Sequence, residues 1–157
     1  MELAKKMTLA YLIKDGKWLM LLRNKKENDI NEGKWIGVGG KVEEGESVEQ
    51  AAIREIEEET GYIVDDIEYC GEVLFLYDIA PAERIYVYQS RNFHGEEIEC
   101  TEGSLSWIKE EDIMDLSLWE GDRIFLKKMM EGNIPFHIML HYDENAKLVE
   151  VKDDDDE

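Results

Sequence analysis

Glu55, Glu58 and Glu59 stand at positions i, i+3 and i+4 of one segment. In an α-helix, at about 100° per residue, such positions lie on one side, within an arc of roughly 100°. Like charges at this spacing cost a helix about 0.2–0.5 kcal/mol per pair, and the neighbouring Arg54 does not balance all of them. A charge run is also typical of a solvated helix face. Because hard divalent cations take oxygen ligands, the cluster indicates a metal site.

The segment that carries these glutamates has the features of an α-helix between Ser47 and Thr60. Ser47 as N-cap and Gln50 three residues later form a capping box, and Gly61 is placed to end the helix in a left-handed turn. An apolar stripe adjoins the glutamates and comprises Val48, Ala52 and Ile56. The stripe is expected to pack on a sheet, which would place the carboxylates at the edge of the core.

A glycine-rich segment leads directly into this helix; its glycines are Gly37, Gly39 and Gly40. Glycine permits close approach of the backbone to a ligand such as phosphate, although many glycine-rich turns are purely structural. The segment is not a P-loop, because Val42 follows Gly40-Lys41 where that motif has Ser or Thr. Lys41 and Arg23 are candidate phosphate contacts, and both are equally compatible with surface cations.

The stretch from Gly40 to Tyr62, GKVEEGESVEQAAIREIEEETGY, resembles the Nudix box, G-x5-E-x7-R-E-U-x-E-E-x-G-U, where U is aliphatic. The matching positions are Gly40, Glu46, Arg54, Glu55, Ile56, Glu58, Glu59 and Gly61. Tyr62 departs from the aliphatic residue at the last position, which is a packing position. The segments around Trp107 and from Trp119 to Asp122 extend the similarity, from about Lys6 to Val151. They resemble the MutT/MutX-like branch of the family, which removes oxidised purine nucleotides such as 8-oxo-dGTP.

This resemblance implies an α/β protein with the Nudix fold, an α/β/α sandwich around a mixed sheet. It implies Mg²⁺, or alternatively Mn²⁺, as cofactor. The implied metal-binding residues are Gly40, Glu55, Glu58, Glu59 and Glu102. Arg54 is expected to orient one of the glutamates, and Glu102 to act as a further ligand or base. The implied reaction is attack of water on the triphosphate, which releases a nucleoside monophosphate and pyrophosphate.

The nucleotide is expected to contact Gly39, Gly40, Lys41, Arg23, Trp119 and Asp122. Trp119 would stack on a purine and Asp122 would bind its edge, but both also fit a helix start packed in the core. Ile36 and Gly121 replace residues with which a relative contacts the base, so the choice of base stays open. Another nucleotide (a normal dNTP, ADP-ribose or a nucleotide sugar) is the alternative substrate. A catalytically silent nucleotide sensor is disfavoured, because the metal-binding glutamates are intact.

Composition limits the remaining classes of function. The chain of 157 residues has 38 acidic and 18 basic residues and a net charge of -20, which argues against nucleic-acid polymers and anionic membranes as partners. A small nucleotide remains compatible, because a bound cation reverses the local field. Cys70 and Cys100 are expected to be free, buried thiols of a cytoplasmic protein. We expect a monomer or weak dimer.

The other elements follow from apolar periodicity and turn residues. Strands are predicted for residues 8–13 and 18–22, which flank the hairpin turn Asp15-Gly16, and for 62–64, 67–76, 84–93 and 106–108. Residues 23–34 are predicted to be a loop, and residues 119–130 a second helix that ends near Gly132 and Pro135. One domain is expected over residues 1–151, followed by a disordered acidic tail over residues 152–157.

Overall fold

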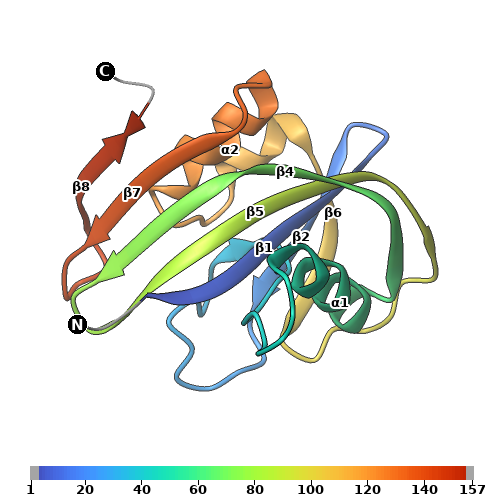
Figure 1. Cartoon of the computed structure of the whole chain (residues 1–157), viewed down its shortest axis with the longest axis horizontal. Coiled ribbons are helices and arrows are strands. Elements are labelled where there is room, and N and C mark those ends of the chain that lie inside the picture. The colour runs from blue at the N-terminus through green and yellow to red at the C-terminus, as the bar shows by residue number, and fades with distance from the viewer. Residues whose placement is uncertain (1–3, 155–157) are drawn as a thin grey trace.

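A computed structural model describes residues 4–154, which form an α/β/α sandwich around a mixed eight-stranded sheet (Figure 1). The strand order is β3-β2-β1-β5-β4-β7-β8, and β6 pairs with β2. The strands are β1 Lys5–Lys14, β2 Lys17–Arg23, β3 Trp35–Ile36, β4 Tyr62–Tyr77, β5 Ala80–Gly95, β6 Gly103–Lys109, β7 Phe136–Tyr142 and β8 Leu148–Asp153. The helices are α1 Val48–Thr60, α2 Asp122–Glu131 and the short 3-10 helix η1 Glu110–Asp115. The predicted fold class is confirmed.

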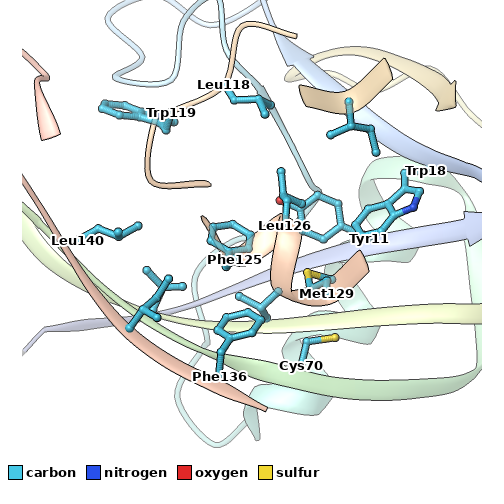
Figure 2. Packing of buried hydrophobic residues seen from close by; sticks show 14 of the residues in the cluster. Tyr11, Trp18, Cys70, Leu118, Trp119, Phe125, Leu126, Met129, Phe136 and Leu140 are labelled. Atoms are coloured by element: carbon cyan, nitrogen blue, oxygen red, sulfur yellow. The ribbon is translucent and has the colours of Figure 1, made fainter. Parts of the chain in front are cut away.

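The sandwich has two hydrophobic clusters because side chains alternate between the faces of a strand. In β1, Tyr11 and Ile13 join the cluster that contains Phe125 of α2, whereas Leu12 joins the cluster that contains Ile56 of α1. Figure 2 shows the first cluster, in which Tyr11 lies beside Trp18, with ring centroids 5.4 Å apart, and Phe125 lies near Phe136, at 5.8 Å. Complete burial of such large side chains stabilises a fold by about 1.5–3 kcal/mol each. The two helices therefore cover opposite faces of the sheet.

Helix α1 begins and ends where its sequence predicts. The Ser47 hydroxyl accepts the Gln50 backbone N–H at 3.1 Å, and the Gln50 side chain accepts the Ser47 N–H at 2.9 Å. Gly61 terminates the helix with a φ of 85°. The predicted β1–β2 hairpin is also present, with positive φ angles of 54° at Asp15 and 73° at Gly16. Two consecutive positive φ angles are those of the hairpin turn that favours Asp-Gly.

Several predicted boundaries are wrong. Residues 62–76 form one continuous strand, β4, because bulges absorb the interruption near Asp66. Helix α2 begins at Asp122 and not at Trp119 as predicted, since Trp119 and Glu120 lie in the preceding turn. Strands β7 and β8 were not predicted from the sequence.

The expected boundary of the acidic tail is also too early. Lys152 and Asp153 pair with β7 as the end of β8. The Lys128 ammonium lies 2.9 Å from the buried Asp153 carboxylate and neutralises it. Residues 155–157, for which disorder was predicted, lie outside the described residues.

Cys70 and Cys100 are both buried free thiols, as predicted. None of the helices within residues 4–154 has the length and apolar character needed to cross a membrane.

Candidate active site

A cavity of about 440 Å³ opens between the glycine-rich segment, the face of the sheet covered by α2, and the loop between β2 and β3. Most residues singled out from the sequence line it: Arg23, Gly39, Gly40, Lys41, Glu55, Glu59, Glu102, Trp119 and Asp122. Arg54 and Glu58 are not among its lining residues. Glu55, Glu59 and Glu102 lie together in one part of the cavity, called the carboxylate end. Trp119 and Phe75, whose ring centroids are 5.5 Å apart, line another part, the aromatic end, with Asp122 and Glu83 beside them.

Glu59 is the most deeply placed carboxylate of α1, with 7% of the residue exposed. Its Oε2 accepts the Gly39 N–H at 2.8 Å. Burial, together with a hydrogen bond to the nearby Glu102 carboxylate, raises the pKa of Glu59 to about 9. Within residues 4–154, no Lys or Arg side chain is paired with this carboxylate. Glu59 therefore holds a proton near neutral pH, and a bound cation would favour its ionised form.

Arg54 binds several carboxylates on the outer side of helix α1. Its Nη1 donates to Glu55 Oε1 at 2.8 Å and to Glu58 Oε2 at 3.2 Å. Its Nε and Nη2 donate to the two oxygens of Glu46, at 2.7 and 3.0 Å. Hydrogen bonds from Arg54, followed by one from the Glu43 backbone N–H, lower the pKa of Glu46 to about 2. The guanidinium thus connects Glu46, the first glutamate of the box, to Glu55, which lines the cavity.

Glu58 lies at the rim, and its side chain is 59% exposed. Its partner within the described residues is Arg54, and its carboxylate does not face the cavity lining. The sequence places Glu55, Glu58 and Glu59 on one helix face, and the structure separates them by depth along that face.

The donor atoms at the carboxylate end fit a hard divalent cation, because Glu55, Glu59 and Glu102 supply oxygens and no sulfur or imidazole. A Cβ added to Gly40 would lie 2.6 Å from Glu55 Oε1, so glycine is what allows this carboxylate to approach the backbone. The Gly40 carbonyl accepts the Thr8 N–H at 2.8 Å and, at the longer distance of 3.4 Å, the Thr8 hydroxyl. Within residues 4–154, no three acidic, His or Cys side chains are gathered closely enough to enclose an ion.

Trp119 lines the other end of the cavity and is also part of the core. It is 4% exposed and packs at 4.8 Å from the Tyr142 ring and 5.5 Å from the Phe75 ring. Its indole N–H donates to Asn31 Oδ1 at 2.8 Å. The Lys34 ammonium lies 5.9 Å from its ring centroid. Trp119 therefore both packs in the core and lines the cavity.

Asp122, in the first turn of α2, lies beside this aromatic end. Burial raises its pKa to about 7, although Lys34 and Arg123 act in the opposite direction. Its neighbour Gly121 has a packing role, because an added Cβ would lie 2.5 Å from a Leu140 methyl group and 2.7 Å from the Tyr142 hydroxyl. An acidic side chain at position 121 would therefore have no room.

Five polar cavity residues were not identified as site residues from the sequence: Thr8, Lys26, Asp29, Asn31 and Glu83. Asp29 accepts the Asn31 N–H at 3.0 Å. Aspartate favours such turns, so its presence in the loop is the feature of the sequence that could have indicated an ordered turn here. Glu83 lies opposite Phe75 in the β4–β5 register, and burial raises its pKa. A charged residue at an inward-facing position of a strand was the corresponding signal for Glu83.

The sequence matches the family model described as NUDIX domain over residues 6–129. It is 32% identical, over 130 residues, to the oxidized purine nucleoside triphosphate hydrolase of Danio rerio, covering 82% of this chain and 81% of that protein. A MutT NUDIX hydrolase from Burkholderia pseudomallei superposes with a TM-score of 0.69 at 30% identity, covering 80% of this chain and 98% of the other. A MutT protein from Bacillus halodurans superposes with a TM-score of 0.87 at 24% identity, covering 96% and 98%; this likeness concerns the fold.

Proposed function

The chain belongs to the Nudix family of hydrolases as a MutT-like member, and on this premise we propose that it hydrolyses oxidised purine nucleoside triphosphates. The substrate class is 8-oxo-dGTP, and the products are 8-oxo-dGMP and pyrophosphate. The cofactor is Mg²⁺, for which Mn²⁺ can substitute. The observation that carries the proposal is the cavity with two chemically different ends.

The two ends suit the two parts of a nucleotide. Glu55, Glu59 and Glu102 surround the place where the phosphate chain and its cation would lie. Trp119 and Asp122, at the other end, offer an aromatic surface and a hydrogen-bonding carboxyl group for a base. The Danio rerio relative is a hydrolase of oxidized purine nucleoside triphosphates by its name, which supports the same substrate class.

In the proposed mechanism, Glu55, Glu59 and Glu102 would hold the divalent cation, with the Gly40 carbonyl as a further oxygen ligand. The Glu58 carboxylate would join them by turning from Arg54 toward the cavity. The bound cation supplies neutralisation of phosphate charge and activation of the attacking water. Arg54 orients Glu55 through the 2.8 Å hydrogen bond. Lys41 and Arg23, both in the cavity wall, bind phosphate oxygens. A carboxylate of the cluster takes the proton of the water as the phosphorus–oxygen bond breaks.

A nucleotide panel tests the proposal. With Mg²⁺, kcat/KM is expected to be higher for 8-oxo-dGTP than for dGTP, and higher for both than for ADP-ribose. The products are identified by chromatography as the monophosphate and pyrophosphate. Equal values for dGTP and 8-oxo-dGTP would refute the preference for oxidised purines and leave the hydrolase activity standing.

The metal assignment has its own test. Glu58→Gln and Glu59→Gln are expected to fold normally and to lose most of the activity. Glu57→Gln is the matched control, because Glu57 is exposed on the same helix and does not line the cavity. Calorimetric titration with Mg²⁺ and Mn²⁺ should show weakened binding in the first two variants. Wild-type turnover in both of them would overturn the assignment.

A further inference from the structure

Asn31 occupies a position at the base end of the cavity to which the proposed mechanism gives no role. It lies in the loop between β2 and β3 and lines the cavity with Trp119 and Asp122. Its Oδ1 accepts the Trp119 indole N–H at 2.8 Å. The contact joins residues that are 88 positions apart in the chain.

This contact determines which way the carboxamide faces. An indole nitrogen is only a donor, so the Asn31 oxygen must be the atom that faces it. The Nδ2 amino group therefore faces away from the indole and keeps both of its N–H donors. Within residues 4–154, Nδ2 makes no hydrogen bond.

The backbone of Asn31 is held in place on its other side. Its N–H donates to Asp29 Oδ1 at 3.0 Å, and the Arg23 Nε lies 2.8 Å from Asp29 Oδ2. The Lys34 N–H donates to the Asn31 carbonyl at 2.9 Å. The carboxamide is thus preorganised, which lowers the entropic cost of using it in recognition.

The residues around Asn31 determine what its free N–H donors can contribute to recognition of a base. Two other polar side chains of the lining, Asp122 and Glu83, are carboxyl groups, which accept hydrogen bonds when ionised. The remaining wall is apolar and includes Ile36 and Phe75. Among these residues, the Asn31 amino group is the side-chain donor that does not depend on protonation.

We infer that Asn31 is a specificity-determining residue whose Nδ2 donates to a carbonyl oxygen of the purine base. The inference rests on the proposed function and selects oxo-purines over amino-purines. A site that is built to bond one group of a substrate discriminates against analogues that lack the group.

The test replaces Asn31 by aspartate. Asn31→Asp keeps an acceptor for Trp119 and replaces the amino donor by an acceptor. The ratio of kcat/KM for dITP to that for dATP is expected to fall about tenfold, as for the loss of one hydrogen bond to the base. Asn28→Asp is the control, because it adds the same charge to the same loop outside the cavity lining. Its ratio should equal that of the wild type.

The outcomes separate this inference from the proposed function. An unchanged dITP to dATP ratio in Asn31→Asp would show that Asn31 only positions Trp119. If that variant does not fold, equal kcat/KM for dITP and dATP on the wild-type protein would overturn the inference. If the wild type hydrolyses neither, calorimetry decides the inference with dIMP and dAMP, and the proposed function is decided separately by hydrolysis of 8-oxo-dGTP. Tighter binding of dIMP would support the inference, and equal or absent binding would refute it.

Discussion

The Arg54 guanidinium binds both oxygens of the Glu46 carboxylate, with distances of 2.7 Å from Nε and 3.0 Å from Nη2. Two parallel hydrogen bonds fix the plane of the guanidinium more strictly than one bond would. The remaining nitrogen, Nη1, donates to Glu55 at 2.8 Å. Glu46 therefore determines, through Arg54, where a cavity carboxylate lies.

Replacing Glu46 by glutamine should disturb the site without unfolding the protein. The amide nitrogen that Glu46→Gln introduces cannot accept from the guanidinium, so Arg54 loses one anchor and Glu55 its fixed position. We expect kcat to fall about tenfold or more, in the range of a misplaced catalytic constellation. Glu43→Gln is the control, because its exposed carboxylate lies 4.0 Å from Arg54. Equal activities of the two variants would contradict the positioning role.

The adjacent glycines Gly39 and Gly40 should respond differently to alanine. A Cβ at Gly40 meets the flexible end of the Glu55 side chain, at 2.6 Å, whereas a Cβ at Gly39 lies 1.9 Å from the Thr8 backbone carbonyl. Gly40→Ala is therefore expected to keep its stability and to lose activity as Glu55 turns away. Gly39→Ala should lose about 1–3 kcal/mol of unfolding free energy through overpacking. Urea unfolding and kcat measured on both variants separate the two effects, and a stability loss in Gly40→Ala as large as that in Gly39→Ala would refute this distinction.

The parts of the site that the sequence predicts are those determined locally. The capping box of Ser47 and Gln50, the glycine at position 61 and the glutamate spacing all act within one helix, so their pattern indicates the element and the side that it presents. Lys152 shows the limit of this reasoning. Its acidic surroundings in the sequence indicate a disordered tail, but β7 offers an edge on which Lys152 pairs with Met139.

The aromatic end of the cavity depends on contacts that no local pattern encodes. Asn31 meets Trp119 only because the β2–β3 loop folds over the start of α2. Glu83 faces the cavity only because β5 lies between β1 and β4 in the sheet. Loop composition predicts an irregular segment over residues 23–34 but not which cavity residues that segment will contact.

The buried carboxyl group of Asp122 should make stability depend on pH. Its pKa is about 7 in the fold, whereas the ordinary value for an aspartate is 3.8. An acid whose folded pKa is raised stabilises the fold fully below the unfolded pKa, and this stability is lost as pH rises through the folded pKa. The difference in Tm between Asp122→Asn and the wild type is therefore expected to grow from pH 4 to pH 7 and then to level off.

The control for Asp122 is Glu120→Gln, which removes the same charge from an exposed position nearby. Its Tm difference from the wild type should stay nearly constant over the same pH range. A constant difference for Asp122→Asn as well would show that its carboxyl group is ionised throughout the range.

The ion pair between Arg23 and Asp29 should contribute far more to stability than the neighbouring pair of Lys25 and Glu99. The Arg23 Nε and Asp29 Oδ2 atoms lie 2.8 Å apart without the alignment of a hydrogen bond, and the side chains are 12% and 6% exposed. Removing one partner leaves a buried charge, which costs about 3 kcal/mol, so Arg23→Gln is expected to lose that amount. Glu99 is 90% exposed, and Lys25→Gln should cost less than about 1 kcal/mol.

Urea unfolding of the two variants measures this difference directly. Asp29→Asn combined with Arg23→Gln should recover part of the loss, because no uncompensated carboxylate then remains. Activity should nevertheless stay low in the double variant, since the asparagine at position 29 can still accept the Asn31 N–H but the guanidinium of Arg23, which the proposed mechanism assigns to phosphate binding and whose Nη1 lies 3.8 Å from Glu102, is lost. Recovery of activity along with stability would mean that the loop between β2 and β3 requires only that positions 23 and 29 carry no unpaired charge. Recovery of stability alone would mean that Arg23 also acts in the cavity, beyond neutralising Asp29.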